Sequence, residues 1–262
     1  MQRYFAQVEY DGSKYCGFQK QTGTKKTIQH FLEKSFSKVA NHRIHVTCAG
    51  RTDSGVHAIS QIVHFDTKSK RKEDSWIKGA NTFLPEDIVI KGIFAVRNNY
   101  HARFDAINRS YTYVIKNSLT PAAIGANNCL WIRSDLNHEK MHKAAQKLVG
   151  EKDFSAFRAS SCQSKSPVRE IFSASISKKG EFIFFRIKGN AFMLNMVRII
   201  MGTLIKVGRE ELTIKEFGDI IKSCDRKRAG KTISPHGLYF VGPEYNELEY
   251  NKKDLVDLIS PF

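Results

Sequence analysis

Hydrophobic and polar positions in the first hundred residues follow the period of a strand and then that of a helix. Alternation rich in β-forming residues predicts a strand over Arg3–Tyr10. Apolar residues at helical spacing predict an amphipathic helix over Thr27–Val39. Shorter elements are predicted at 45–48, 61–65, 76–82 and 88–96. The order strand, helix, strand, strand, helix, strand is that of a ferredoxin-like α+β unit, whose end falls near residue 105.

Strands and helices alternate again in the second half. A strand is predicted over Arg109–Ile115, and a helix begins at Asn137 and stops at Gly150. The later elements are a strand pair at 171–177 and 181–188, a helix that opens at 189 and reaches 207, and a helix at 212–224. The segment 233–241 then leads into a closing strand. We therefore expect an α+β fold of two ferredoxin-like (RRM-like) halves with antiparallel sheets around a central basic cleft, divided into domains 1–105 and 106–262.

The chain carries a large positive charge. Its 42 Lys and Arg residues against 26 Asp and Glu give a formal charge of +16. Such an excess suits a polyanionic partner, because each neutralised phosphate releases condensed counterions. The alternative is a chain that is simply rich in lysine. An anionic membrane surface fits less well, because no long basic amphipathic helix is present.

Cysteine and histidine spacing argues against a metal site. The five cysteines are scattered, and none form a Cys-x-x-Cys pair, which is typical of reduced thiols in a cytosol. The nine histidines contain no His-Glu-x-x-His motif. The first residues are already strand-like, so we expect no signal peptide, and no apolar run approaches the roughly 18 residues of a membrane span. These features favour a soluble cytoplasmic protein without metal or membrane.

The most distinctive stretch is the loop Ala49–Ala58, which lies between two predicted strands. Gly50 and Gly55 bracket Arg51 and Asp53, so the loop can turn sharply and present both side chains. On turn chemistry alone, Asp53 would be a turn or capping residue, since Asp commonly hydrogen-bonds nearby main-chain amides.

The sequence of this loop resembles that of the active-site loop of the TruA family of tRNA pseudouridine synthases. The family's usual form is Gly-Arg-Thr-Asp-Ala-Gly-Val-His-Ala, and this chain differs only at Ser54, a small residue that suits the same turn. The resemblance implies a pseudouridine-synthase fold and makes Asp53 the catalytic nucleophile, with Arg51 beside it.

Further segments carry the resemblance through the rest of the chain. The segment Arg109-x-Tyr111-x-Tyr113 is similar to a family strand whose first Tyr contacts the target uracil. The alternative is an amphipathic strand with the same pattern, whose aromatic side chains only pack on a core. The segment Gly189–Arg198 resembles a motif whose Arg approaches the catalytic Asp. An Arg on a largely apolar helix also needs a carboxylate or phosphate partner, and Asp53 is the candidate for Arg198.

Other basic residues are candidates for RNA contact. Lys14 lies within a glycine-punctuated loop with two aromatics, and Lys20 follows it; a solvent-facing loop without RNA contact is the alternative. Arg103 lies in a segment similar to the family's His-Ala-Arg-Phe, and Arg109 opens the strand that carries Tyr111.

The implied reaction breaks the C1′–N1 bond of uridine and joins C1′ to C5. A stacked base must first be flipped out, which costs a few kcal/mol that aromatic stacking and phosphate contacts offset. Arg51 would fill the gap left by the base or hold its phosphate. Asp53 would attack C1′, attack C6 or abstract a ribose proton. The isomerisation involves no redox change or group donor, so we expect no cofactor, metal or other small-molecule partner.

The resemblance implies uridines 38, 39 and 40 of the tRNA anticodon stem-loop as targets, and a homodimer. Two other classes compete with this hypothesis. A non-catalytic RNA-binding module would bind RNA in the same basic cleft and would not require the carboxylate of Asp53. A carboxylate-dependent glycosidase would need a second carboxylate as acid or base, which the loop does not offer.

Overall fold

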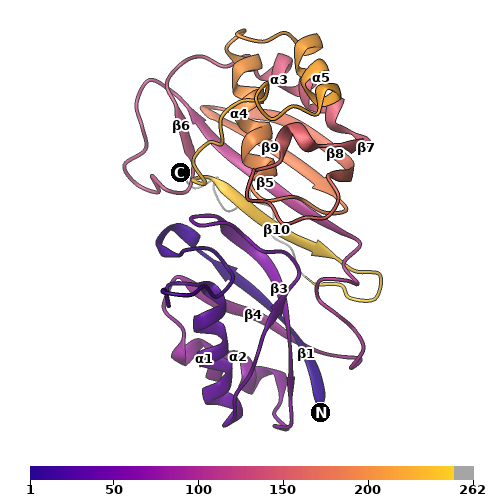
Figure 1. Ribbon diagram of the computed structural model, residues 1–262. Coiled ribbons are helices and arrows are strands. Elements are labelled where there is room, and N and C mark those ends of the chain that lie inside the picture. The colour runs from indigo at the N-terminus through magenta and orange to yellow at the C-terminus, as the bar shows by residue number, and fades with distance from the viewer. Residues whose placement is uncertain (251–262) are drawn as a thin grey trace. The chain divides into compact units, whose positions relative to one another are not determined.

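The structure, a computed structural model, describes residues 1–250 and divides into two compact units (Figure 1). The N-terminal unit consists of Met1–Ile107 and the segment that begins at Tyr239. The middle unit consists of Asn108–Leu238. Residues 251–262, which the sequence assigned to the second domain, lie outside the described residues.

The N-terminal unit follows the predicted ferredoxin-like order. Its elements are β1 (Gln2–Tyr10), η1 (Gly12–Lys14), α1 (Ile28–Ala40), β2 (Thr47–Cys48), β3 (His57–Thr67), α2 (Glu73–Phe83) and β4 (Ile88–Val96). β1 lies between β3 and β4 and pairs with both in antiparallel orientation, while β2 pairs with β3. This strand order is the one that two right-handed strand–helix–strand crossovers produce.

A late segment of the chain completes this sheet. β10 (Leu238–Glu244) pairs in parallel with the start of β3, with Tyr239 opposite His57 and Phe240 opposite Ala58. The predicted boundary at residue 105 lies close to the end of the first segment, at Ile107. The closing strand, however, groups with the N-terminal unit rather than with the second domain, because its ladder runs along β3.

Aromatic side chains fill the space between this sheet and its helices. Phe36 of α1 stacks on Phe65 of β3 with ring centroids 4.5 Å apart, and Trp76 of α2 lies 5.2 Å from the same ring. All three side chains are fully buried. Burial of one such ring relative to exposure contributes about 1.5–3 kcal/mol, so the spacing of these positions explains why α1 and α2 dock here.

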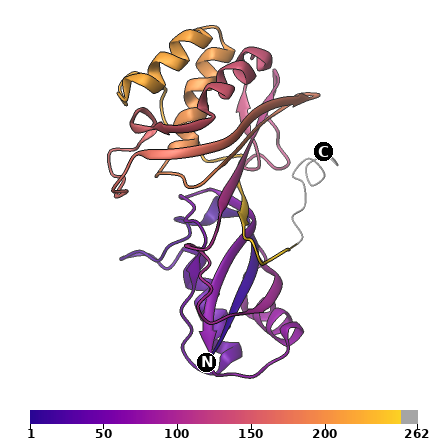
Figure 2. The ribbon, with the colours of Figure 1, turned by 90° about the vertical axis from the view of Figure 1, so that its right-hand side faces the viewer.

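The middle unit also combines helices with a mostly antiparallel sheet. Its elements are β5 (Asn108–Asn117), β6 (Leu130–Ile132), α3 (His138–Ala145), η2 (Gln146–Leu148), β7 (Gly150–Asp153), η3 (Ser155–Phe157), β8 (Val168–Lys179), β9 (Phe182–Gly189), α4 (Met196–Gly208) and α5 (Ile214–Ser223). The sheet runs β5-β9-β8-β7 with antiparallel pairs, and β6 pairs in parallel with β5. Figure 2 shows the helices of this unit together on one side of its strands.

The predicted α+β fold in two halves is confirmed, with shifted boundaries at several elements. The closing strand, for example, runs over Leu238–Glu244. β3 begins at His57, which the sequence placed in the preceding loop. The helix expected to open at 189 begins at Met196, because Gly189 ends β9 and Asn195 adopts a left-handed conformation with φ of 59°. Within residues 1–250, no helix combines the length and apolar character needed to cross a membrane.

Candidate active site

Asp53 lies in the loop that joins β2 to β3, as the sequence predicts. The main-chain N–H of Val56 donates to the carbonyl of Asp53 over 3.2 Å and closes a tight turn. Gly55 occupies the third position of this turn with φ of 77°, a conformation that glycine adopts without strain. Asp53 is half-buried and Arg51 is exposed. The turn uses the main chain of Asp53, so turn chemistry and a functional carboxylate are compatible.

A second loop supports this turn from beneath. The N–H of Phe18 donates to Thr52 O over 3.0 Å, and the N–H of Gly55 donates to Tyr15 O over 3.3 Å. The Ser54 hydroxyl donates to the same Tyr15 carbonyl over 3.1 Å. A Cβ on Gly17, whose φ is 91°, would lie 2.9 Å from Thr52 O. The approach of the two loops is therefore too close for a side chain at that position.

Buried side chains from β1 and β3 hold the two flanks of the turn. The Tyr10 hydroxyl lies 2.7 Å from Thr52 Oγ1, and burial raises the pKa of Tyr10, so the phenol stays protonated. The Gln61 amide donates to Gly50 O over 2.6 Å. Both supporting side chains are almost fully buried. A satisfied buried hydrogen bond contributes about 1 kcal/mol, and each one here also restrains the loop.

His57 begins β3 directly after the loop and is buried. Its Nδ1 lies 3.0 Å from Asp11 Oδ1, and its ring stacks on Tyr239 of β10 with centroids 4.8 Å apart. The hydrogen bond with His57 holds the pKa of Asp11 well below its usual range, so the carboxylate stays ionised. Asp11, Tyr10 and Gln61 are supporting residues that the sequence did not single out. Their contacts join segments far apart in the chain, so hydrophobic and polar patterning does not reveal them.

The middle unit carries Tyr111, Arg109 and Arg198. Tyr111 is largely buried on β5, and its ring meets Phe192 edge to face at 5.1 Å. Arg109 Nη1 donates to Asn190 O over 2.9 Å. Tyr113, on the same face of β5, is fully buried and donates its hydroxyl proton to Ser234 O, consistent with the packing role that the sequence assigned to it.

Arg198 lies in the first turn of α4. Its Nε donates to Ile233 O over 2.8 Å, and its Nη1 donates to Asn195 Oδ1 over 2.7 Å. These neutral partners fix the plane of the guanidinium and leave its positive charge unneutralised within the middle unit. The requirement for an anionic partner, expected from the sequence, thus stays a prediction.

The other basic candidates belong to the N-terminal unit. The Lys14 ammonium lies 3.5 Å from Asp87 Oδ2, with 82% of its side chain exposed. Lys20 forms an ion pair with the buried Glu33 carboxylate, which also accepts from the N–H of Val46 over 3.2 Å. Burial raises the pKa of Glu33, but hydrogen bonds from Lys20, Val46 and Gln29 outweigh it and lower the pKa below its ordinary value. The pairing gives Lys20 a structural role beside its predicted RNA contact.

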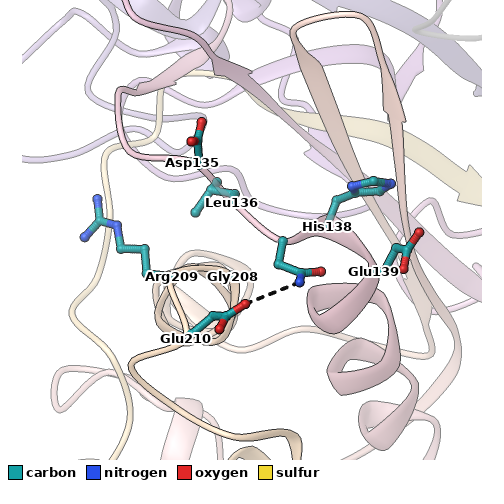
Figure 3. Close-up of a pocket in the computed structure, with 8 residues that line it drawn as sticks. Asp135, Leu136, His138, Glu139, Gly208, Arg209 and Glu210 are labelled. Atoms are coloured by element: carbon teal, nitrogen blue, oxygen red, sulfur yellow. Dashed lines mark hydrogen bonds between the residues drawn. The ribbon is translucent and has the colours of Figure 1, made fainter.

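A surface pocket of about 540 Å³ lies in the middle unit, between the start of α3 and the end of α4 (Figure 3). It is lined by residues 135–139 and 208–210, none of which the sequence predicted as functional. Asn137 caps α3 by accepting from the N–H of Lys140 and donates to Glu210 over 3.4 Å. Glu210 in turn lies 2.9 Å from the Lys140 ammonium. These contacts identify a helix-capping region.

Among residues 1–250, no three His, Cys, Asp or Glu side chains lie together in a way that could hold a metal ion. The described cysteines are all free thiols.

Comparison with known proteins identifies the family. A family model described as tRNA pseudouridine synthase matches residues 6–105 and 144–246. The chain is 46% identical over 253 residues to tRNA pseudouridine synthase A of Francisella tularensis subsp. novicida, covering 97% of this chain and 98% of the relative. It is 45% identical over the same length to tRNA pseudouridine synthase A of Francisella philomiragia, with the same coverage.

One solved structure, titled "Crystal Structure of a Cbf5-Nop10-Gar1 Complex", aligns with a TM-score of 0.37 and 9% identity, covering 77% of this chain and 45% of that chain. This likeness is too weak to bear on fold or function. The family match and the identity to the curated relatives extend through both halves of the chain. The protein therefore belongs to the tRNA pseudouridine synthase family.

Proposed function

We propose that this protein is an isomerase that converts uridine to pseudouridine in tRNA, with Asp53 as its nucleophile. The observation that carries the proposal is the Asp53 loop, in a chain 46% identical to relatives named tRNA pseudouridine synthase A. The hydrogen bonds that brace this loop support it, because a reacting carboxylate must be held within a fraction of an ångström of its target.

The reaction exchanges one glycosidic bond for another. The C1′–N1 bond breaks, the uracil rotates, a C1′–C5 bond forms, and the proton displaced from C5 is replaced by one on N1. A carboxylate is already ionised near neutral pH, so Asp53 needs no general base to activate it. Atoms and electrons balance within the nucleotide itself, and the reaction draws on no cofactor or metal.

Each of the other candidate residues has a separate role in the proposal. Arg51 fills the gap left by the flipped base or holds its phosphate, Tyr111 contacts the uracil, and Arg198 supplies positive charge to the catalytic carboxylate. A pair of opposite charges about 4 Å apart gives about 4 kcal/mol of gross attraction at an effective dielectric of ~20. The residues proposed for RNA contact are Arg109, Lys14, Lys20 and Arg103.

The finer parts of the proposal rest on family resemblance. They are uridines 38, 39 and 40 of the anticodon stem-loop as targets, a homodimer as the active form, and the cytoplasm as the location. The formal charge of +16 supports a polyanionic substrate.

Tritium release from unmodified tRNA that carries 5-³H-uridine tests the reaction directly, since the proton at C5 is lost only when the new bond forms. We expect release by the wild type and none by Asp53→Ala or the isosteric Asp53→Asn. All three proteins should bind tRNA with similar affinity in a filter-binding assay. Residual activity of Asp53→Asn close to the wild type would overturn the nucleophile assignment. Tight tRNA binding without release by the wild type would favour a non-catalytic RNA-binding protein.

A further inference from the structure

The turn formed by residues 101–105 of the N-terminal unit holds an aromatic ring out in solvent. Phe104 is 75% exposed, although neighbouring Ala102 and Ala106 are buried. An isolated exposed apolar side chain is common and needs no explanation by itself. What sets Phe104 apart is the number of contacts that hold its turn.

His101 and Asp105 tie the two ends of the turn together. The N–H of His101 donates to Asp105 Oδ2 over 2.6 Å, and the N–H of Asp105 donates to His101 O over 3.1 Å. The ring nitrogen Nδ1 of His101 accepts from the N–H groups of Arg103 and Phe104, at 3.0 and 3.2 Å. The main chain that presents Phe104 is thus restrained on both sides by side-chain hydrogen bonds.

The Phe104 ring is also oriented by stacking. Its centroid lies 4.3 Å from that of His101, with the planes 27° apart, and the Arg103 guanidinium carbon lies 5.8 Å from the Phe104 centroid. His101 therefore backs the ring while most of its surface stays open to solvent, with a cation beside it. Stacking on one side reduces the rotamer entropy that a ligand would otherwise have to remove.

His64 of β3 contacts the turn at 101–105 and holds it against the sheet. Its Nδ1 accepts from the N–H of Ala102 over 3.2 Å, and its ring meets His101 at 4.5 Å. Burial lowers the pKa of His64 to about 4 and also lowers that of His101. Both rings are therefore neutral near pH 7, as acceptance of a hydrogen bond at Nδ1 requires.

The same turn is packed together with the base of the candidate catalytic loop. Ala49, the first residue of that loop, lies in one buried cluster with Ala102 and Ala106, which flank Phe104 on either side. Phe5 and Ile62 of the sheet complete the contact between them. The exposed ring thus shares a rigid support with the loop that carries Asp53.

We propose that Phe104, backed by His101 and flanked by Arg103, is a stacking platform for an unpaired nucleobase of the RNA substrate. The proposal rests on the proposed function, because it takes tRNA as the ligand. A single ring beside a cation matches one base and its phosphate, whereas a protein partner would need a wider apolar surface. Within the turn, the other exposed side chains, Arg103 and Asp105, are charged.

The stacking proposal can be tested by substitutions at position 104 that keep an apolar side chain but remove the flat ring. Phe104→Ala and Phe104→Leu should each weaken binding of unmodified tRNA about tenfold, because neither presents a flat ring, and Phe104→Trp should bind as well as the wild type. The matched control is Phe83→Ala, which removes a ring that is 52% exposed at the end of α2, and should leave binding unchanged. Thermal melting by circular dichroism should be the same for all five proteins.

Fluorescence gives a second, direct measurement. In Phe104→Trp the added indole emission should be quenched by saturating tRNA, after subtraction of the wild-type signal, because a stacked base quenches indole. Wild-type affinity in Phe104→Leu, or no quenching in Phe104→Trp, would overturn the platform. Changes in the oligomeric state of Phe104→Ala by sedimentation, without loss of tRNA affinity, would identify a protein interface instead and overturn it as well.

The two proposals fail in different ways. If wild-type protein releases tritium from 5-³H-uridine tRNA but Phe104→Ala binds tRNA normally, the platform falls and the proposed function stands. If the wild type binds tRNA and Phe104→Ala does not, but no tritium is released, the platform stands and the catalytic proposal falls. Absence of tRNA binding by the wild type overturns both.

Discussion

The loop that carries Asp53 and the strand that carries Tyr111 hold their side chains in place by different means. β5 pairs with β9 in unbroken antiparallel register from Arg109 to Lys116. The loop at 49–56 instead takes its shape from other segments, through the contacts of Gly17, Tyr10 and Gln61. A strand positions a residue by its own ladder, whereas an irregular loop depends on its neighbours. Substitutions in the segments that contact the loop should therefore disturb the position of Asp53 strongly. Substitutions around β5 should disturb the position of Tyr111 less.

Among substitutions that leave Asp53 in place, the largest effect on stability and activity is expected from Gly12→Ala. A Cβ at this position would lie 1.9 Å from Val56 O and 2.5 Å from Val56 C, so the two loops must separate. We expect a loss of about 3 kcal/mol in the free energy of unfolding in urea and at least a hundredfold fall in tritium release by the folded fraction.

The control for that prediction is Gly218→Ala in α5, where nothing lies within 4 Å of an added Cβ. Because alanine favours a helix over glycine, this variant should gain up to about 1 kcal/mol and keep its activity. Equal stability of Gly12→Ala and the wild type would show that the close approach of the two loops does not constrain the turn.

A matched pair of hydroxyl deletions tests the comparison itself. Thr52→Val removes the hydrogen bond to Tyr10 beside the loop, and Tyr113→Phe removes the hydrogen bond to Ser234 beneath β5. Each should lower the free energy of unfolding by about 1 kcal/mol, because each deletes one hydrogen bond of a buried side chain. Single-turnover tritium release should fall about tenfold in Thr52→Val but stay within twofold of the wild type in Tyr113→Phe. The same fall in both variants would contradict the distinction between loop and strand.

The smallest effect is expected from Ser54→Ala. The Ser54 residue is exposed, and its hydroxyl donates one hydrogen bond to Tyr15 O, the carbonyl that also accepts from the N–H of Gly55. The variant should lose about 0.5 kcal/mol of stability and retain activity within twofold, because the main-chain contact remains. A tenfold loss of activity would instead show that the hydroxyl is needed to hold the turn.

The sequence predicted regular elements well wherever side-chain periodicity was strong. The strand at 88–96 has the predicted bounds, and the helix over Thr27–Val39 appears as α1 one residue later. Such local patterns follow from which face of an element is buried. The motif at 49–58 likewise located a loop of the expected kind between two strands.

What the sequence did not predict depends on contacts between distant segments or on single backbone conformations. The parallel pairing of Tyr239 with His57 has no local signature, and it moves the closing strand into the N-terminal unit. The left-handed conformation of Asn195 delays the start of α4. Pairing of Lys20 with the buried Glu33 was missed for the same reason, since only the fold brings them together.

The pairing of β10 with the start of β3 also has a consequence for synthesis on the ribosome. Domains generally fold as their chains emerge, with the N-terminal part first. Here the strand that flanks His57, directly after the loop that carries Asp53, is among the last described segments to be translated. A nascent chain can therefore form β1, β3 and β4 early, but the sheet beside Asp53 stays incomplete until translation has passed Glu244. Formation of this part of the sheet is thus tied to translation of β10, which follows the Asp53 loop by more than a hundred residues.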